Sequence, residues 1–235
     1  MTESAQFVLD FGHQPGFSAA DFLVADNNAD AHGWIMRWPD WPSFALGLFG
    51  PAGCGKSHLA HIFCERNGGI VVPATALNSE DVPRFASHPA VALEDADREV
   101  DEPALFHLFN LLREQRRFLL LTGRDAPARW PVRLPDLRSR LSSIPVAAIR
   151  SPGDDLLEAL LVKLFADRQL RVGPDVLTFL LPRMERTFDA ARALVAAIDD
   201  AALAHRRDIT VSLVRGVLQA ASDAPSSPES SRHDE

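Results

Sequence analysis

Short apolar runs alternate with segments of helical periodicity through the first two thirds of the chain. The runs predict buried strands at 44–49, 70–72, 90–93, 118–121 and 144–149. Between them, apolar residues recur at three- and four-residue spacing, most clearly at Leu105, Leu108 and Leu112, and predict helices. Alternating strands and helices are typical of a parallel sheet with helices on both faces. The pattern therefore predicts an α/β fold.

The alternation ends near residue 150. From there on, the apolar spacing predicts only helices, at 154–168, 175–184, 189–206 and 211–221. The first residues are polar, and the last dozen are rich in Ser, Pro and acidic residues, a composition typical of disorder. We therefore expect an N-terminal arm, an α/β domain, a small all-α domain and a disordered tail, with boundaries at 1–16, 17–150, 151–221 and 222–235.

One stretch between the first strand and the following helix carries the clearest chemistry. It reads Gly50, Pro51, Ala52, Gly53, Cys54, Gly55, Lys56, Ser57, and it fits the phosphate-binding pattern of Gly, four residues, Gly, Lys and Ser or Thr. Its glycines let backbone N–H groups face phosphates, and the helix N-terminus adds a partial positive charge. We expect Lys56 to reach the outer phosphates and the Ser57 hydroxyl to coordinate Mg²⁺. The strand, loop and helix context favours a nucleotide site over a plain glycine-rich turn.

Polar residues follow two of the predicted strands. The strand at 90–93 leads into Glu94 and Asp95, and the strand at 118–121 leads into Thr122. In phosphate-loop enzymes the metal and the attacking water lie at the carboxyl ends of the strands. Glu94 is thus a candidate magnesium ligand, Asp95 a candidate for activating water and Thr122 a candidate sensor of the terminal phosphate. An ordinary strand end leading into a solvated acidic turn is the alternative for the two acids.

Composition narrows the classes of function. The chain has 235 residues, of which 46% are hydrophobic, enough for a buried core. Its formal net charge of -8 argues against a large DNA surface, because binding to the phosphate backbone needs clustered Lys and Arg, so we expect no direct sequence-specific DNA binding. No apolar run approaches the roughly 18 residues of a membrane span, and the start lacks a signal-peptide pattern, so we expect a cytoplasmic protein without a membrane partner. Two cysteines allow neither a disulfide framework nor a zinc site.

The motifs together resemble the AAA+ ATPases, and within them the DnaA-related branch, which includes the replication initiator DnaA and its shorter relative Hda. The resemblance covers nearly the whole chain. It is carried by the phosphate loop with His58 and Leu59, by an adenine-pocket entry at 21–24, by a sensor 1 at Thr122 and Gly123, by an arginine-finger segment at 134–141 and by a sensor 2 at 186–188. The last two segments favour Hda over other AAA+ members. The resemblance implies a five-stranded parallel sheet followed by a helical lid.

The resemblance also implies roles for residues. ADP or ATP, with Mg²⁺, would contact the loop from Gly50 to His58 together with Phe22, Leu23, Val24, Thr122 and Arg186. Arg140, in preference to Arg138, would be the finger directed at a neighbour's nucleotide. Glu94 stands where the family usually has Asp, so we expect weak or absent intrinsic hydrolysis. The chain also ends soon after Leu218, without room for the DNA-binding domain of a full initiator.

The N-terminal arm holds a further candidate motif. Gln6, Phe7, Leu9 and Phe11 resemble the peptide by which Hda binds the sliding clamp, a Gln followed by apolar residues that fill a groove. Packing of these residues on the chain's own domain is the alternative.

The function that the resemblance implies is negative regulation of replication initiation. Its partners would be DnaA and the DNA polymerase III beta sliding clamp, and the protein would promote hydrolysis of DnaA-bound ATP. Self-association into a homo-oligomer stays open. The alternatives are a stand-alone AAA+ ATPase such as a helicase loader, which would need its own competent acids and a DNA surface, and a small-molecule kinase. The helical C-terminal region and the paired arginines argue against the kinase.

Overall fold

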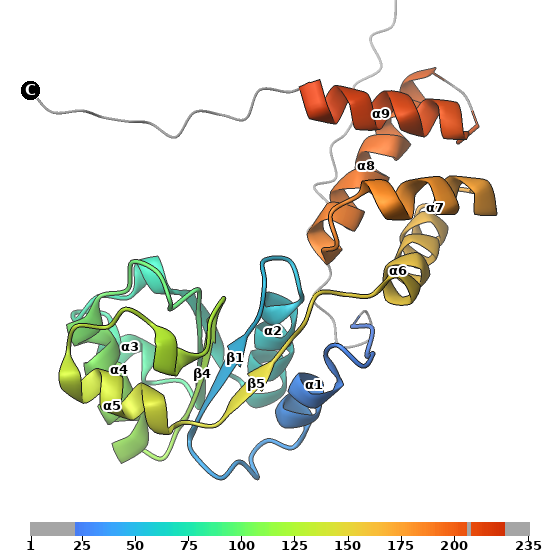
Figure 1. Cartoon of the computed structure of the whole chain (residues 1–235). Coiled ribbons are helices and arrows are strands. Elements are labelled where there is room, and N and C mark those ends of the chain that lie inside the picture. Colours follow the sequence, from blue (N-terminus) through green and yellow to red (C-terminus); the bar gives the residue numbers. More distant parts are fainter. Residues whose placement is uncertain (1–21, 206–207, 224–235) are drawn as a thin grey trace, which may run out of the picture.

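The computed structural model describes residues 22–205 and 208–223. The candidate clamp motif at Gln6, Phe7, Leu9 and Phe11 lies outside the described residues. The centre of the N-terminal part is a five-stranded sheet of order β2-β3-β4-β1-β5 (Figure 1). Its strands are β1 (Ala45–Phe49), β2 (Ile70–Pro73), β3 (Ala90–Glu94), β4 (Phe118–Gly123) and β5 (Val146–Ala148). All four neighbouring pairs are parallel, which confirms the predicted α/β sheet.

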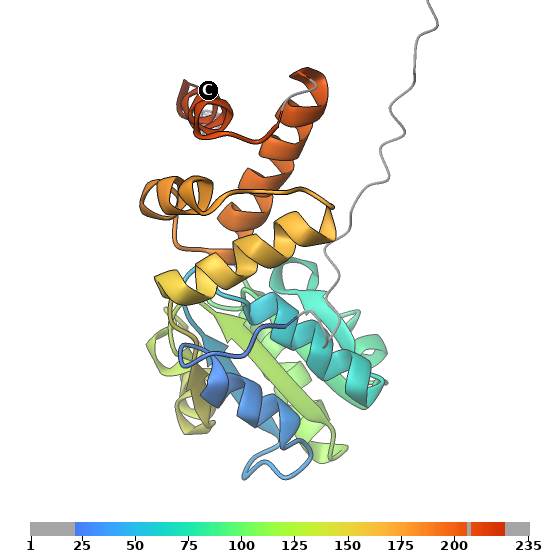
Figure 2. The same ribbon diagram turned by 90° about the vertical axis from the view of Figure 1, so that its right-hand side faces the viewer.

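Helices cover both faces of the sheet. On one face lie α1 (Ala29–Met36) and α2 (Lys56–Asn67), and on the other lie α3 (Val82–Phe85), α4 (Glu102–Glu114) and α5 (Pro135–Ser143) (Figures 1 and 2). Side chains alternate between the faces along each strand. Ala92 therefore packs with α1 and α2, whereas Leu93 packs with α4 and α5. Because the strands are parallel, the carboxyl ends of β1, β3 and β4 meet at one edge of the sheet, where the phosphate loop begins.

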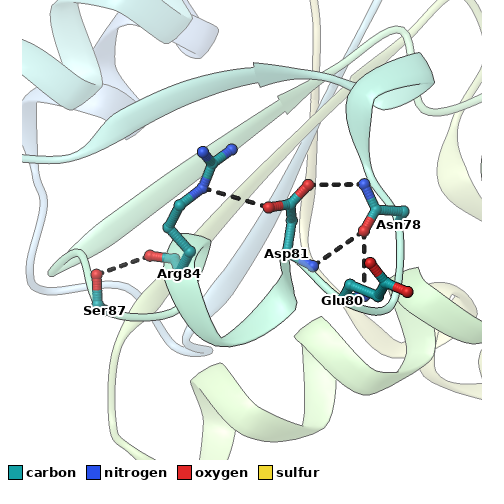
Figure 3. Close-up of polar contacts among 5 residues, drawn as sticks. All are labelled: Asn78, Glu80, Asp81, Arg84 and Ser87. Carbon is teal, nitrogen blue, oxygen red and sulfur yellow. Dashed lines mark hydrogen bonds and ion pairs between the residues drawn. The ribbon is translucent and has the colours of Figure 1, made fainter.

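The sequence did not predict the single-turn elements. One of them, α3, is held by polar side chains in the loop before it (Figure 3). The Asn78 Oδ1 atom accepts backbone N–H groups of Glu80 (3.1 Å) and Asp81 (2.9 Å), and the Asn78 amide donates to Asp81 Oδ2 (2.7 Å). The Asp81 carboxylate also pairs with Arg84 (3.5 Å), and the Ser87 hydroxyl donates to the Arg84 carbonyl (2.7 Å). Four residues are too few for apolar periodicity to be read.

The C-terminal part is helical, as predicted. It contains α6 (Asp154–Asp167), α7 (Pro174–Leu180), α8 (Phe188–His205) and α9 (Val211–Asp223) around an apolar cluster of their own. The helix predicted at 175–184 ends earlier, at Leu180, and residues Leu181–Arg183 form a 3-10 turn. Pro182 explains the difference, because proline lacks the N–H that a continuing α-helix needs.

Both views place these four helices beyond one end of the sheet domain (Figures 1 and 2). The first turn of α8 contacts the phosphate loop, so the helices cover the edge at which the predicted site residues gather. Within the described ranges, no helix is both long and apolar enough to cross a membrane.

Candidate nucleotide site

The phosphate loop is held in shape by its own lysine. Lys56 is only 7% exposed, and its ammonium donates to the carbonyl oxygens of Gly50 (2.8 Å) and Pro51 (2.9 Å). Gly53 and Gly55 adopt positive φ values of 64° and 105°, conformations that glycine reaches without strain. Gly55 is the N-cap residue of α2, so the helix begins directly at the loop. The loop is thus preformed for anions, with its positive charge facing inward.

A cavity of about 250 Å³ lies between this loop, the sheet edge and the helical region. Nine of the residues predicted to form the site line it: Phe22, Leu23, Ala52, Gly53, Gly55, Lys56, Ser57, His58 and Asp95. The other predicted residues do not line it, and their positions are described below. Gly50 and Cys54 belong to the loop but do not line the cavity, and burial is the main cause that raises the pKa of the Cys54 thiol.

One end of the cavity is aromatic. The Phe22 ring meets His58 edge to face, with centroids 5.1 Å apart, and stacks on His32 at 5.6 Å. The buried Asn28 side chain fixes the approach to Phe22, because it donates to the Leu23 carbonyl (2.9 Å) and accepts the Ala25 N–H (2.9 Å). Val24, in contrast, is 52% exposed and does not line the cavity. A flat, largely apolar group such as a nucleobase suits this end.

The acids lie at the carboxyl end of β3. The hydroxyl of Thr122, which is 1% exposed, accepts the backbone N–H of Asp95 (3.1 Å), so Thr122 positions Asp95 and does not itself line the cavity. Asp95 has a φ of 52° and carries its side chain to the cavity wall. The Oε1 atom of Glu94 is buried and has no hydrogen-bond partner among the described residues. An unpaired buried carboxylate oxygen at the carboxyl end of β3 fits a ligand to magnesium-bound water, although Glu94 does not line the cavity.

Two arginines that the sequence analysis did not select also line the cavity. Arg98 comes from the acidic turn after β3, and Arg124 follows β4 two residues after Thr122. The Asp97 carboxylate accepts the backbone N–H of Arg124 (2.8 Å) and so joins the two segments. The available signal was weak, because each arginine stands alone in a loop and only the pairing of β3 with β4 brings them together.

The helical region closes the cavity with the first turns of α8. The Thr187 hydroxyl accepts the Ala190 N–H (3.0 Å) as an N-cap, and the Phe188 N–H donates to the Gly53 carbonyl (2.9 Å). This arrangement brings Phe188, Asp189 and Arg192 to the cavity, together with Leu160 of α6. Among the charged lining residues, four are basic and two are acidic, so the cavity favours an anionic ligand.

The predicted sensor arginine lies elsewhere. Arg186 pairs with Asp154 of α6 (2.8 Å), both side chains are about half exposed, and neither lines the cavity. Arg186 precedes the N-cap Thr187 and therefore stands outside α8, whereas Arg192 lies in the helix and faces the loop. Arg186 thus does not line the cavity, and its contact with the nucleotide stays a prediction, whereas Arg192 lines the cavity.

The two candidate finger arginines on α5 differ in their surroundings. The Arg140 guanidinium lies over Phe106 of α4, 4.9 Å from the ring centroid, and 5.8 Å from that of Phe109. Its Nε atom is buried without a hydrogen-bond partner among the described residues. Arg138 is exposed. Neither arginine lines the cavity of its own chain, as a group directed at a neighbour requires.

Comparison with known proteins adds two findings. Residues 154–218 match the family model of the Hda lid domain. An uncharacterized protein of Haemophilus influenzae is 26% identical over 184 residues, which cover 73% of this chain and 80% of that protein.

Solved structures share the fold. Domain III of the Thermotoga maritima replication initiation protein DnaA matches with a TM-score of 0.73 and 16% identity, over 88% of this chain and 97% of that one. AMPPCP-bound DnaA from Aquifex aeolicus matches with a TM-score of 0.69 and 16% identity, over 89% and 71% of the two chains. At these identities the likeness is one of fold.

Proposed function

Starting from a chain that is Hda-like in its lid and DnaA-like in its AAA+ fold, we propose that this protein is a DnaA-related regulator of replication initiation that binds an adenine nucleotide. The observation that carries the proposal is the cavity in which the phosphate loop, an aromatic end and lid residues converge. The matched Aquifex aeolicus DnaA holds AMPPCP, an adenine nucleotide analogue, which supports the same class of ligand here.

The two ends of the cavity suit different parts of the nucleotide. Phe22 and His58 receive the base, because their rings form the apolar end. The loop amides and Lys56 bind the phosphates, and Lys56 gives up one or both of its carbonyl contacts to do so. Arg192 and Arg124, from opposite walls, face the outer phosphates. This division explains why basic residues outnumber acidic ones around the cavity.

A magnesium ion fits the same cavity. The Ser57 hydroxyl and the Asp95 carboxylate, which line the cavity, would hold it together with phosphate oxygens, and Glu94, which does not line the cavity, would act through bound water. The ion would supply neutralisation of phosphate charge. The Thr122 hydroxyl accepts the Asp95 backbone N–H and so helps to hold the Asp95 backbone at the cavity before any ligand binds. Glu94 is longer by one methylene than the Asp usual in the family, so we expect slow hydrolysis by this chain alone.

The regulatory action we propose is in trans. Docked on the sliding clamp by its N-terminal arm, the protein would present α5 to DnaA, and Arg140 would stabilise the charge that develops on the transferred phosphoryl group. The exposed position of α5 away from its own cavity supports this assignment. Arg138 is the alternative donor, because its side chain is not packed on aromatic rings.

The test is a reconstituted hydrolysis assay. DnaA loaded with radiolabelled ATP is mixed with clamp on DNA and with this protein plus ADP or ATP, and the released phosphate is measured. We expect hydrolysis to accelerate with wild type and not with Lys56→Ala. No acceleration by a folded wild type would refute the proposal. Turnover by the protein alone, increased by single-stranded DNA, would support a helicase loader instead.

A further inference from the structure

An acidic side chain stands at the wall of a cavity otherwise suited to anions. The Oδ2 atom of Asp189 lies 3.1 Å from the point that a Cβ atom on Gly53 would occupy. Its backbone cannot easily withdraw, because Thr187 caps the helix and the Phe188 N–H is bonded to the Gly53 carbonyl. A carboxylate is therefore held beside the loop whose amides and lysine would receive phosphates.

Arg192 lies one turn further along α8 and pairs loosely with this carboxylate, at 3.8 Å. Both residues line the cavity. The Arg192 side chain is 27% exposed and that of Asp189 is 75% exposed, so the arginine is the more enclosed partner. A phosphate entering the cavity would compete with Asp189 for the same guanidinium, and an arginine can contribute fully to only one of them.

The negative charge of Asp189 also reaches the loop itself. The pKa of the buried Cys54 thiol is raised chiefly by desolvation, and the Asp189 carboxylate acts in the same direction. Lys56 opposes this effect. Ligand phosphates, cradled on the inner side of the same loop, would experience the same two charges.

We propose that Asp189 is a selectivity residue that weakens binding progressively as the nucleotide carries more phosphate charge, both by direct repulsion and by withholding Arg192. The inference rests on the proposed nucleotide site and deepens it. Each phosphate added to an adenosine adds about one negative charge, so the penalty increases from mono- to di- to triphosphate. The affinity of the lid for a nucleotide thus depends on the ligand's charge, through the opposite charges of Asp189 and Arg192 on α8.

A purely structural role for Asp189 makes the opposite prediction. An acid in the first turn of a helix stabilises that helix through the helix dipole. Neutralising it would then loosen the start of α8 and weaken the binding of every nucleotide. The sign of the change in affinity separates the two roles.

The experiment measures the binding of AMP, ADP and ATP to wild type and Asp189→Asn by titration calorimetry without divalent cations. A unit charge about 4 Å away in water is worth roughly a fivefold change in affinity, and salt reduces it. We therefore expect Asp189→Asn to strengthen binding by about two- to fivefold per added phosphate, with the gain shrinking at high ionic strength. Asp167→Asn is the matched control, because it removes the same charge at the Lys163 pair outside the cavity, and it should leave the three affinities in their wild-type ratio.

A second variant tests the part played by the arginine. If Arg192 is shared, the gain from Asp189→Asn shrinks in the Arg192→Ala background, and the two changes are not additive. An equal change for all three nucleotides, or weaker binding of ATP in Asp189→Asn, overturns the inference and leaves the nucleotide site intact. A wild type that binds none of the three overturns the proposed nucleotide site and the inference with it.

Discussion

Replacing Gly53 with alanine tests the contact between the phosphate loop and the lid. A Cβ atom at this position would lie 2.8 Å from Thr187 Cβ, closer than side-chain carbons approach one another in folded proteins. Both atoms are close to the backbone, so no rotamer change relieves the contact. The start of α8 must move away from the loop, and the bond between the Phe188 N–H and the Gly53 carbonyl (2.9 Å) is then lost.

Gly68 offers a matched control. Its φ of 62° is close to the 64° of Gly53, but a Cβ atom there would meet nothing within 4 Å. Each alanine in the left-handed region costs about 1–2 kcal/mol. For a chain of this length, that corresponds to a fall in melting temperature of roughly 2–8 °C. Gly53→Ala carries in addition the lost hydrogen bond, about 1 kcal/mol, and overpacking of about 1–3 kcal/mol if the lid stays in place.

The assay combines thermal unfolding with titration of ADP. We expect Gly68→Ala to lower the melting temperature and to leave nucleotide affinity unchanged. Gly53→Ala should weaken nucleotide binding about tenfold or more, because displacing α8 removes the lid residues from the cavity, and tenfold corresponds to only about 1.4 kcal/mol. If the two variants bind ADP equally and lose the same stability, the contact between loop and lid does not contribute to the site.

Three further predictions concern other parts of the molecule. Arg140→Ala should lower the unfolding free energy by about 0.5–2 kcal/mol, because its cation–π contacts are lost, and should abolish the acceleration of DnaA hydrolysis; loss of acceleration in Arg138→Ala instead would reassign the finger. Changing Gln6 and Leu9 to alanine should abolish binding in a clamp pull-down without changing ADP affinity, and an undiminished pull-down would exclude the arm. Burial raises the pKa of Cys64 to about 12 from 9.0, so the thiol stabilises the folded state below pH 9 and loses that contribution as the pH approaches 12. The unfolding free energy should fall by about 1.4 kcal/mol per pH unit across that window and less steeply in Cys64→Ala, and equal slopes would contradict the assignment.

The sheet and the longer helices could be predicted because each has a repeated physical signal. Four apolar residues in a row, as in Phe118 to Leu121, between segments of helical periodicity favour a strand buried on both faces, and β4 is indeed central. The short α3 has no such repeated signal: it buries only Val82 and Phe85, and side-chain hydrogen bonds around Asn78 hold the turn before it. The early end of α7 could have been predicted from the sequence, because Pro182 stands inside the predicted helix.

The residues of the candidate site also differ in how far the sequence predicts them. The loop residues are contiguous in sequence, so one motif located five of the cavity's lining residues at once. Thr122 was identified as part of the site, but its action was not, because its bond to the Asp95 N–H depends on the pairing of β3 with β4. Arg98 and Arg124 reach the cavity from two different turns. Contacts that form only in the tertiary structure cannot be predicted from the spacing of residues along the sequence.

The start of α8 decides which lid arginine faces the phosphate loop. Arg186 and Arg192 are six residues apart, and either can face the loop until the first residue of α8 is fixed. Thr187 fixes it, because its hydroxyl caps the helix, and the cap leaves Arg186 outside, free to pair with Asp154. A helix that starts at Phe188 then brings Asp189 and Arg192 to the same face, three residues apart. The cap that leaves Arg186 outside the helix therefore also brings Asp189 to the phosphate loop, so any change that shifts the start of α8 should move Asp189 and Arg192 together.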